Sequence, residues 1–133
     1  MRIDVTDPPR VFRVGLGADF YLADCARVHL APDEQVTFTT EAGAEYDLAR
    51  KDFGFYATPS LNGRLIGFGL RAVLIRNRQD RYYILLVERG REASFEQYLE
   101  VEQLHIVCWM DTTEALQALE ARMTQGESVD STS

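Results

Sequence analysis

Polar and apolar positions alternate along much of the chain, and this alternation predicts β-strands. The segment 10–17 alternates in part and follows the pair Pro8–Pro9, so we expect a first strand that starts after a turn. In the segment 25–30 the even-numbered residues are apolar, whereas the odd-numbered ones include Arg27 and His29. This is the period of a strand with one covered face.

Two hairpins are predicted in the middle of the chain. The segments 35–39 and 45–49 alternate and flank Gly43, whose access to positive φ suits a short hairpin loop. The segments 70–77 and 81–88 flank a polar turn and are apolar at nearly every position. Continuous apolar runs are typical of strands covered on both faces, so we expect the second hairpin at the centre of the sheet.

The period changes to that of helices towards the C-terminus. Ser94 and Gln97 have the spacing of a capping box, which predicts a helix of about ten residues here. A strand is expected over 104–110. Asp111 and Glu114 repeat the capping spacing, and the apolar stripe that follows predicts a closing helix.

Together these elements predict an α+β fold with a mainly antiparallel sheet of about five to six strands and two C-terminal helices on one face. The length of 133 residues fits one domain, which we expect over residues 1–123. The segment 124–133 is polar and is expected to be a disordered tail.

The chain lacks the features of a membrane-spanning or exported protein. It contains no run of about 18 apolar residues, and its first residues lack the apolar core of a signal peptide. We therefore expect a cytoplasmic location without membrane insertion. In that reducing compartment Cys25 and Cys108 are expected to be buried thiols rather than a disulfide.

Charge is unevenly distributed. The net charge of −7 argues against generic binding to nucleic acid or to anionic membranes. The segment 50–91 holds nine basic and three acidic residues, a net +6, so the remainder carries −13. Either this basic segment pairs with the acidic flanks inside the fold, or it presents a cationic surface to an anionic partner.

Metal, nucleophile and cofactor sites receive little support. A strand separates residues i and i+4 by about 13 Å and points i and i+3 to opposite faces, which opposes a zinc site built from two strands. No local signature marks a cysteine nucleophile. The Gly-x-Gly segments 15–17 and 67–69 do not extend to GxGxxG, so no nucleotide cofactor is expected. The potential zinc ligands are Cys25, His29, His105 and Cys108.

The segment "RKDFGFYATPSLNGR", Arg50–Arg64, is the main candidate for a binding site. Pro59 and Gly63 punctuate it, which predicts an irregular connection of about fourteen residues, and connections of this length are often functional. Arginine and lysine side chains there suit a phosphate or carboxylate. Alternatively, Phe53 and Phe55 fill the core and the segment is only a turn. The candidate ligand-binding residues are Arg50, Lys51, Asp52, Tyr56, Ser60, Asn62 and Arg64.

The segments "AEYDLARKDFGFYATPSLNGRL", "FGLRAVLIRN" and "RYYILLVERG" resemble a small family of bacterial proteins without an assigned activity. The resemblance covers about residues 24–111. It implies a setting in surface polysaccharide or nucleotide-sugar synthesis, and it supplies no catalytic residues.

Three functions remain open. The leading hypothesis is a non-enzymatic accessory protein of the cytoplasm that binds a small anionic ligand or a protein partner. The second is a small enzyme acting on a phosphorylated or nucleotide-linked sugar, with Asp52 or Tyr56 transferring a proton while Lys51 and Arg64 hold negative charge. The third is a structural subunit that forms a homodimer through a sheet edge.

Overall fold

The structure is a computed structural model that describes residues 1–17 and 19–132, with side chains as far as Gly126. The described residues form eight antiparallel strands in three small sheets, together with three helices, two of them C-terminal. The predicted α+β class with mainly antiparallel pairing is confirmed. The strands are divided among three sheets, whereas a single sheet of five to six strands was expected.

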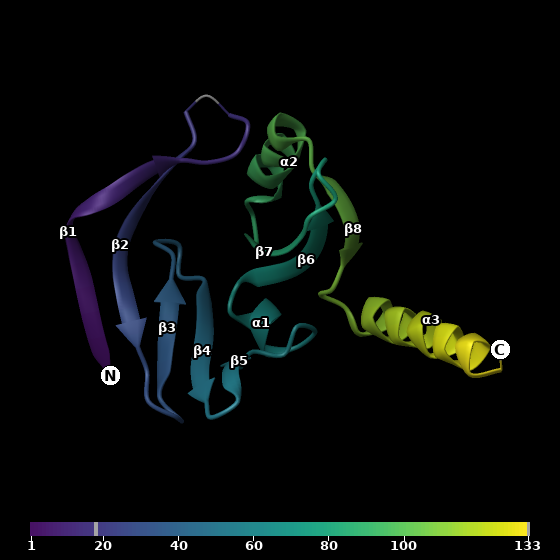
Figure 1. The fold of residues 1–133 in the computed structure, drawn as a ribbon. Coiled ribbons are helices and arrows are strands. Elements are labelled where there is room, and N and C mark those ends of the chain that lie inside the picture. Colours follow the sequence, from purple (N-terminus) through teal and green to yellow (C-terminus); the bar gives the residue numbers. More distant parts are fainter. Residues whose placement is uncertain (18, 133) are drawn as a thin grey trace.

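Figure 1 shows the sheets following one another in an arc, with α3 projecting away from them. The sheet orders are β1-β2, β3-β4-β5 and β7-β6-β8. In chain order the elements are β1 Arg2–Arg13, β2 Tyr21–His29, β3 Gln35–Thr39, β4 Glu45–Lys51, β5 Gly54–Ala57, α1 Arg64–Gly67, β6 Leu70–Arg76, β7 Tyr82–Glu88, α2 Glu92–Glu102, β8 His105–Trp109 and α3 Thr113–Thr132.

Strands β1 and β2 form a long two-stranded unit, here called the ribbon. The predicted start of the first strand after Pro8–Pro9 is wrong, because β1 begins at Arg2 and continues through the two prolines. The register shifts between Val5 and Arg10, so the prolines lie in a bulge. A bulge interrupts the ladder, and prolines without N–H groups are tolerated there.

The sheet β7-β6-β8 carries the core on both faces of β6. Ala72 and Leu70 pack with Leu65 of α1 on one face, and Val73 and Ile75 pack with residues of α2 and β8 on the other. The expectation of two central strands holds for β6 and is wrong for β7. Strand β7 is an edge strand whose first three residues, Tyr82, Tyr83 and Ile84, are exposed.

The C-terminal helices begin differently from the prediction. Helix α2 starts at Glu92 without a side-chain cap, so Ser94 lies inside the helix and the capping box is wrong. The amide of Ala115 donates to Thr112 Oγ1 at 3.1 Å, so Thr112 caps α3 in place of Asp111. The expected tail 124–133 lies mostly outside the residues whose side chains are described, and it stays a prediction.

The basic segment 50–91 pairs in part with the acidic flanks. Lys51, Arg64 and Arg71 form ion pairs with Asp33, Asp47 and Asp111, all outside that segment. Arg76 pairs with Asp80, which belongs to the same segment. Within the part of the chain that the structure describes, no ion pair involves the other five cations, Arg50, Arg78, Arg81, Arg89 and Arg91.

Candidate functional site

The segment Arg50–Arg64 is more regular than the sequence suggested. Strand β4 ends at Lys51, and β5 begins at Gly54, which pairs with Lys51 across a tight turn. Gly54 has a φ of 145°, a conformation that favours glycine, so the chain reverses here at little cost. The expectation of a long irregular connection is therefore wrong.

Most candidate residues of this segment already have partners in the fold. Lys51 Nζ lies 2.5 Å from Asp33 Oδ1, and Arg64 Nη2 lies 3.5 Å from Asp47 Oδ2. Asp52 and Tyr56 are exposed. The other three make local hydrogen bonds: Arg50 donates to the carbonyls of Lys51 and Leu30, Ser60 Oγ accepts from the amide of Arg64, and Asn62 donates to Thr113 Oγ1.

These residues do not converge on one cleft. Asp47, the partner of Arg64, and Lys51, the partner of Asp33, lie on the same face of β4. They are four residues apart, which is about 13 Å along a strand, so the two ion pairs are separate. Neither of the two described pockets is lined by a candidate residue. Phe53 and Phe55 are 79% and 65% exposed, so the alternative that they fill the core is wrong.

Two substitutions compare the contributions of these ion pairs to stability. Arg64→Ala is expected to lower the free energy of unfolding by about 1 kcal/mol, because it removes the charged partner of the buried Asp47. Lys51→Ala, which removes an exposed pair, is expected to cost less than about 0.5 kcal/mol. Urea denaturation measures both. Equal losses would contradict this assignment.

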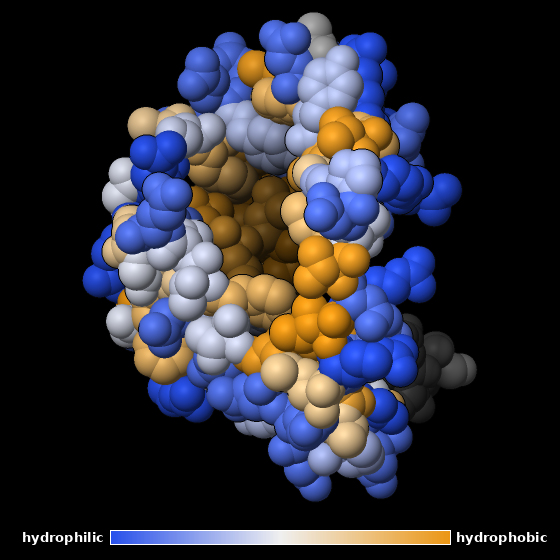
Figure 2. All heavy atoms as spheres, turned by 90° about the vertical axis from the view of Figure 1, so that its left-hand side faces the viewer, coloured by the Kyte–Doolittle hydropathy of each residue, from blue (hydrophilic) through white to orange (hydrophobic). Residues whose placement is uncertain are grey.

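A hollow elsewhere in the molecule is the better candidate. Figure 2 shows a deep recess with hydrophobic residues in its interior. The larger described pocket has a volume of about 600 Å³ and lies between the loop that joins β1 to β2 and the structure around β6, β7 and α2. We call it the loop pocket; it is lined by Val14, Gly15, Leu16, Ile75, Asn77, Arg78, Gln79, Tyr83, Leu85, Tyr98, Glu102 and Leu104.

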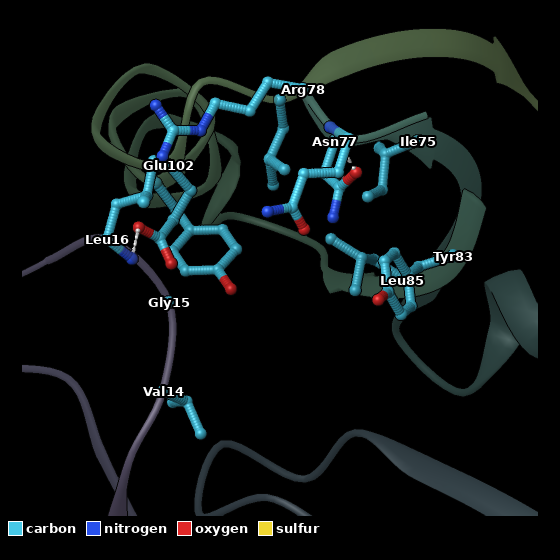
Figure 3. A pocket seen from close by; sticks show the side chains of 12 residues that line it. Val14, Gly15, Leu16, Ile75, Asn77, Arg78, Tyr83, Leu85 and Glu102 are labelled. Atoms are coloured by element: carbon cyan, nitrogen blue, oxygen red, sulfur yellow. Dashed lines mark hydrogen bonds between the residues drawn. The ribbon is translucent and has the colours of Figure 1, made fainter. Parts of the chain in front are cut away.

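The loop is held against α2 by a buried carboxylate. Glu102 is 6% exposed, and its Oε2 atom accepts hydrogen bonds from the amides of Leu16 at 2.6 Å and Gly17 at 3.0 Å (Figure 3). Gly15 has a φ of 70°, and a Cβ atom there would lie 1.7 Å from Glu102 Oε1. Consecutive backbone amides of this kind form an anion-binding nest, and here a side chain of the same protein occupies it.

Tyr98 completes the contact between loop and helix. Its ring lies 5.7 Å from the ring of Phe20, measured between centroids. Burial, and secondly the charge of Glu102, raise the pKa of Tyr98 above its usual 10.0. Because the folded state favours the neutral phenol, this contribution to stability is complete below pH 10 and is lost as the pH rises further. At neutral pH the phenol is uncharged.

The opposite side of the loop pocket carries polar groups on the turn between β6 and β7. Asn77 Oδ1 accepts hydrogen bonds from the amides of Gln79 and Arg81, each at 2.9 Å, which fixes the turn. Figure 3 shows the side chain of Arg78 extending towards the side where Leu16 and Glu102 lie. The loop pocket therefore combines apolar walls with an exposed guanidinium at its rim.

The second Gly-x-Gly segment lines the smaller pocket, of about 180 Å³. The amides of Gly67, Phe68 and Gly69 donate to the carbonyls of Gly63, Arg64 and Ile66. These donors are thus committed to α1 and its end, so they do not form a phosphate cradle.

The four potential zinc ligands lie on two strands of different sheets, β2 and β8. Cys25 and His29 belong to β2, and His29 Nε2 lies 2.9 Å from Asp4 Oδ2. Both cysteines are free, but Cys25 is exposed, so the expectation that it is buried is wrong. Among the described residues no three His, Cys, Asp or Glu side chains gather as metal ligands would.

Sequence reasoning missed the loop pocket because its walls come from segments far apart. Leu16 and Glu102 are separated by 86 positions, and no periodic pattern connects them. One signal in the sequence is the segment Gly15–Leu16–Gly17, whose glycines suit a loop with free backbone amides as well as a nucleotide motif. A second was the pair Tyr82–Tyr83 beside a polar turn.

Comparison with protein-family models, with curated proteins and with solved structures finds no match to this chain. None of the helices that the structure describes combines the length and the apolar character required to cross a bilayer.

Proposed function

We propose that this protein is a non-enzymatic binding protein whose loop pocket holds a small molecule with an apolar or planar body and an anionic group. The observation that carries the proposal is the pocket of about 600 Å³ with largely apolar walls and Arg78 at its rim. Small-molecule sites typically have volumes of about 300–1,000 Å³ and few polar groups, which fix the ligand's orientation.

The lining of the loop pocket favours binding over catalysis. Its carboxylate, Glu102, is already engaged by two backbone amides. The raised pKa of Tyr98 keeps its phenol protonated at neutral pH, so Tyr98 is not available as a general base. The twelve lining residues include no Ser, Cys, Thr or Lys nucleophile. The enzyme hypothesis based on the segment 50–64 has no geometric support.

A nucleotide sugar is one ligand of the proposed class. Its base would stack against Tyr83 or Tyr98, and its diphosphate would meet Arg78. This choice also agrees with the polysaccharide setting that the sequence resemblance implies. A lipid-like carboxylic acid has the same combination of an apolar body and an anionic end, so the test includes both.

The first test uses anilinonaphthalene sulfonate, an apolar fluorophore with one anionic group. Tyr83→Ala is expected to weaken its binding about tenfold, equivalent to ~1.4 kcal/mol, because the ring forms part of the pocket wall. Tyr82→Ala is the matched control, since Tyr82 is the adjacent residue of β7, is similarly exposed and does not line the loop pocket. Equal effects of both substitutions would contradict the proposal.

The anionic part of the ligand is tested on the turn. Arg78→Ala is expected to weaken binding of the fluorophore about fivefold, since an exposed charge pair contributes about 1 kcal/mol, whereas Arg81→Ala is expected to leave it unchanged. Thermal shifts with nucleotide sugars, sugar phosphates and fatty acids then identify the class. A true ligand at a hundred times its Kd adds about 2.7 kcal/mol of stability.

A further inference from the structure

One face of the ribbon is apolar, and most of its residues are exposed in the part of the chain that the structure describes. Residues that pair across an antiparallel ladder share a face, and so do alternate residues of one strand. One face of the ribbon is therefore formed by the cross-strand pairs Ile3–Val28, Val5–Ala26, Arg10–Asp24 and Phe12–Leu22. Of these eight residues, only Phe12 and Asp24 are even half-buried.

Within residues 1–17 and 19–126, hydrogen bonds hold the ribbon to the rest of the chain near its ends. The loop at one end binds Glu102, and at the other end Arg50 donates a hydrogen bond to the carbonyl of Leu30. Between these ends both strands are exposed over almost their whole length. An isolated two-stranded ribbon is only marginally stable in water, so a covering layer is needed to hold it in this form.

The accessible surface of the chain is larger than that of a compact monomer of the same mass. The accessible surface is 9744 Å², whereas a compact monomer of this mass exposes about 7,100 Å². The excess is roughly 2,600 Å² per chain, and an obligate homodimer buries about 2,000–5,000 Å² over both partners. This excess includes the surface of the projecting helix α3, so the ribbon supplies only part of it. An interface that buries about 1,000 Å² on each chain needs less than half of the excess.

The charges on the same face are self-complementary. Arg10 and Asp24 lie between two apolar stretches, with Arg10 Nη2 3.9 Å from Asp24 Oδ2. A two-fold interface brings the same surface of two copies together, so it requires that each cation meet an anion. A two-fold axis near this pair would place Arg10 of each copy against Asp24 of the other, with Val5 and Leu22 among the apolar residues on either side.

We infer that two copies of this chain pair through the apolar faces of their ribbons, packed face to face about a two-fold axis near Arg10 and Asp24. The inference is independent of the proposed function, because none of the residues on this face lines the loop pocket. Pocket variants such as Tyr83→Ala are expected to keep the dimer, so the two proposals fail separately.

The oligomeric state is the direct test. Sedimentation and light scattering on the full chain at micromolar concentration are expected to give twice the chain mass of 15.1 kDa. Val5→Glu is expected to reduce this to the monomer mass. Val11→Glu is the matched control, because Val11 lies on the same strand with similar exposure, 62% against 73%, but on the opposite face. A monomeric wild type, or dimer loss in both variants, would overturn the inference.

Charge reversal distinguishes a broken interface from a misfolded ribbon. Arg10→Asp alone and Asp24→Arg alone each place like charges at the centre of the proposed interface, so each variant is expected to be monomeric. An equimolar mixture restores opposite charges between the chains and is expected to recover the dimer mass. If the mixture stays monomeric, or if both single variants remain dimeric, Arg10 and Asp24 do not meet across a two-fold axis and the inference fails.

Discussion

Asp111→Ala is expected to lower the free energy of unfolding by about 3 kcal/mol, the largest stability effect that we predict. The carboxylate is only 6% exposed, and its Oδ2 atom lies 2.6 Å from Arg71 Nε. The guanidinium of Arg71 in turn stacks over the ring of Trp109 at 4.0 Å. Removing the anion leaves a cation that is 29% exposed without its partner, beside an aromatic core.

Urea denaturation followed by circular dichroism measures this loss. Asp80→Asn is the control, because Asp80 also pairs with an arginine but its side chain is 80% exposed. Asparagine tolerates the φ of 59° at this position, so loss of the charge is expected to cost less than about 0.5 kcal/mol. If Asp111→Ala is no more destabilising than Asp80→Asn, the Arg71–Asp111 pair does not stabilise the contact between β6 and the segment that joins β8 to α3.

Glu102→Ala is expected to have the second largest effect, a loss of about 2 kcal/mol together with weaker binding of the fluorophore. The substitution leaves the amides of Leu16 and Gly17 without the carboxylate that accepts from both. The loop then keeps the contact between Phe20 and Tyr98 but loses its hydrogen bonds to α2, which loosens one wall of the loop pocket.

Hydrogen exchange reports the opening of the loop directly. In Glu102→Ala the amides of Leu16 and Gly17 are expected to exchange at least about tenfold faster, which corresponds to ~1.4 kcal/mol of lost protection. Glu100→Ala, on an exposed position of the same helix, is expected to leave both rates unchanged. Unchanged rates in Glu102→Ala would show that the carboxylate does not hold the loop.

Local patterns predicted most strands and both C-terminal helices, because period and turn chemistry act over a few residues. The hairpin around Gly43 appears as β3 and β4, and the helical period after residue 91 appears as α2. Where local signals conflicted, the prediction failed. Pro8–Pro9 suggested a turn, yet the bulge in β1 accommodates both prolines.

The loop pocket was not predicted from the sequence, because it depends on contacts between distant segments. The cations Lys51 and Arg64 were visible in the sequence, but their partners Asp33 and Asp47 were not. The apolar residues of β7 predict a strand covered on both faces. The structure instead places β7 at a sheet edge, with Tyr83 in the wall of the loop pocket. Apolar residues at such an edge indicate surface that a ligand or partner covers.

The central claim, that the loop pocket is the binding site, is tested most directly by mapping amide chemical shifts while anilinonaphthalene sulfonate is titrated into the full chain. The account predicts that the largest changes lie in the segments 14–16 and 77–79, which form opposite walls of the loop pocket. Changes concentrated in the segment 50–64, or spread evenly over the apolar surface, would contradict it.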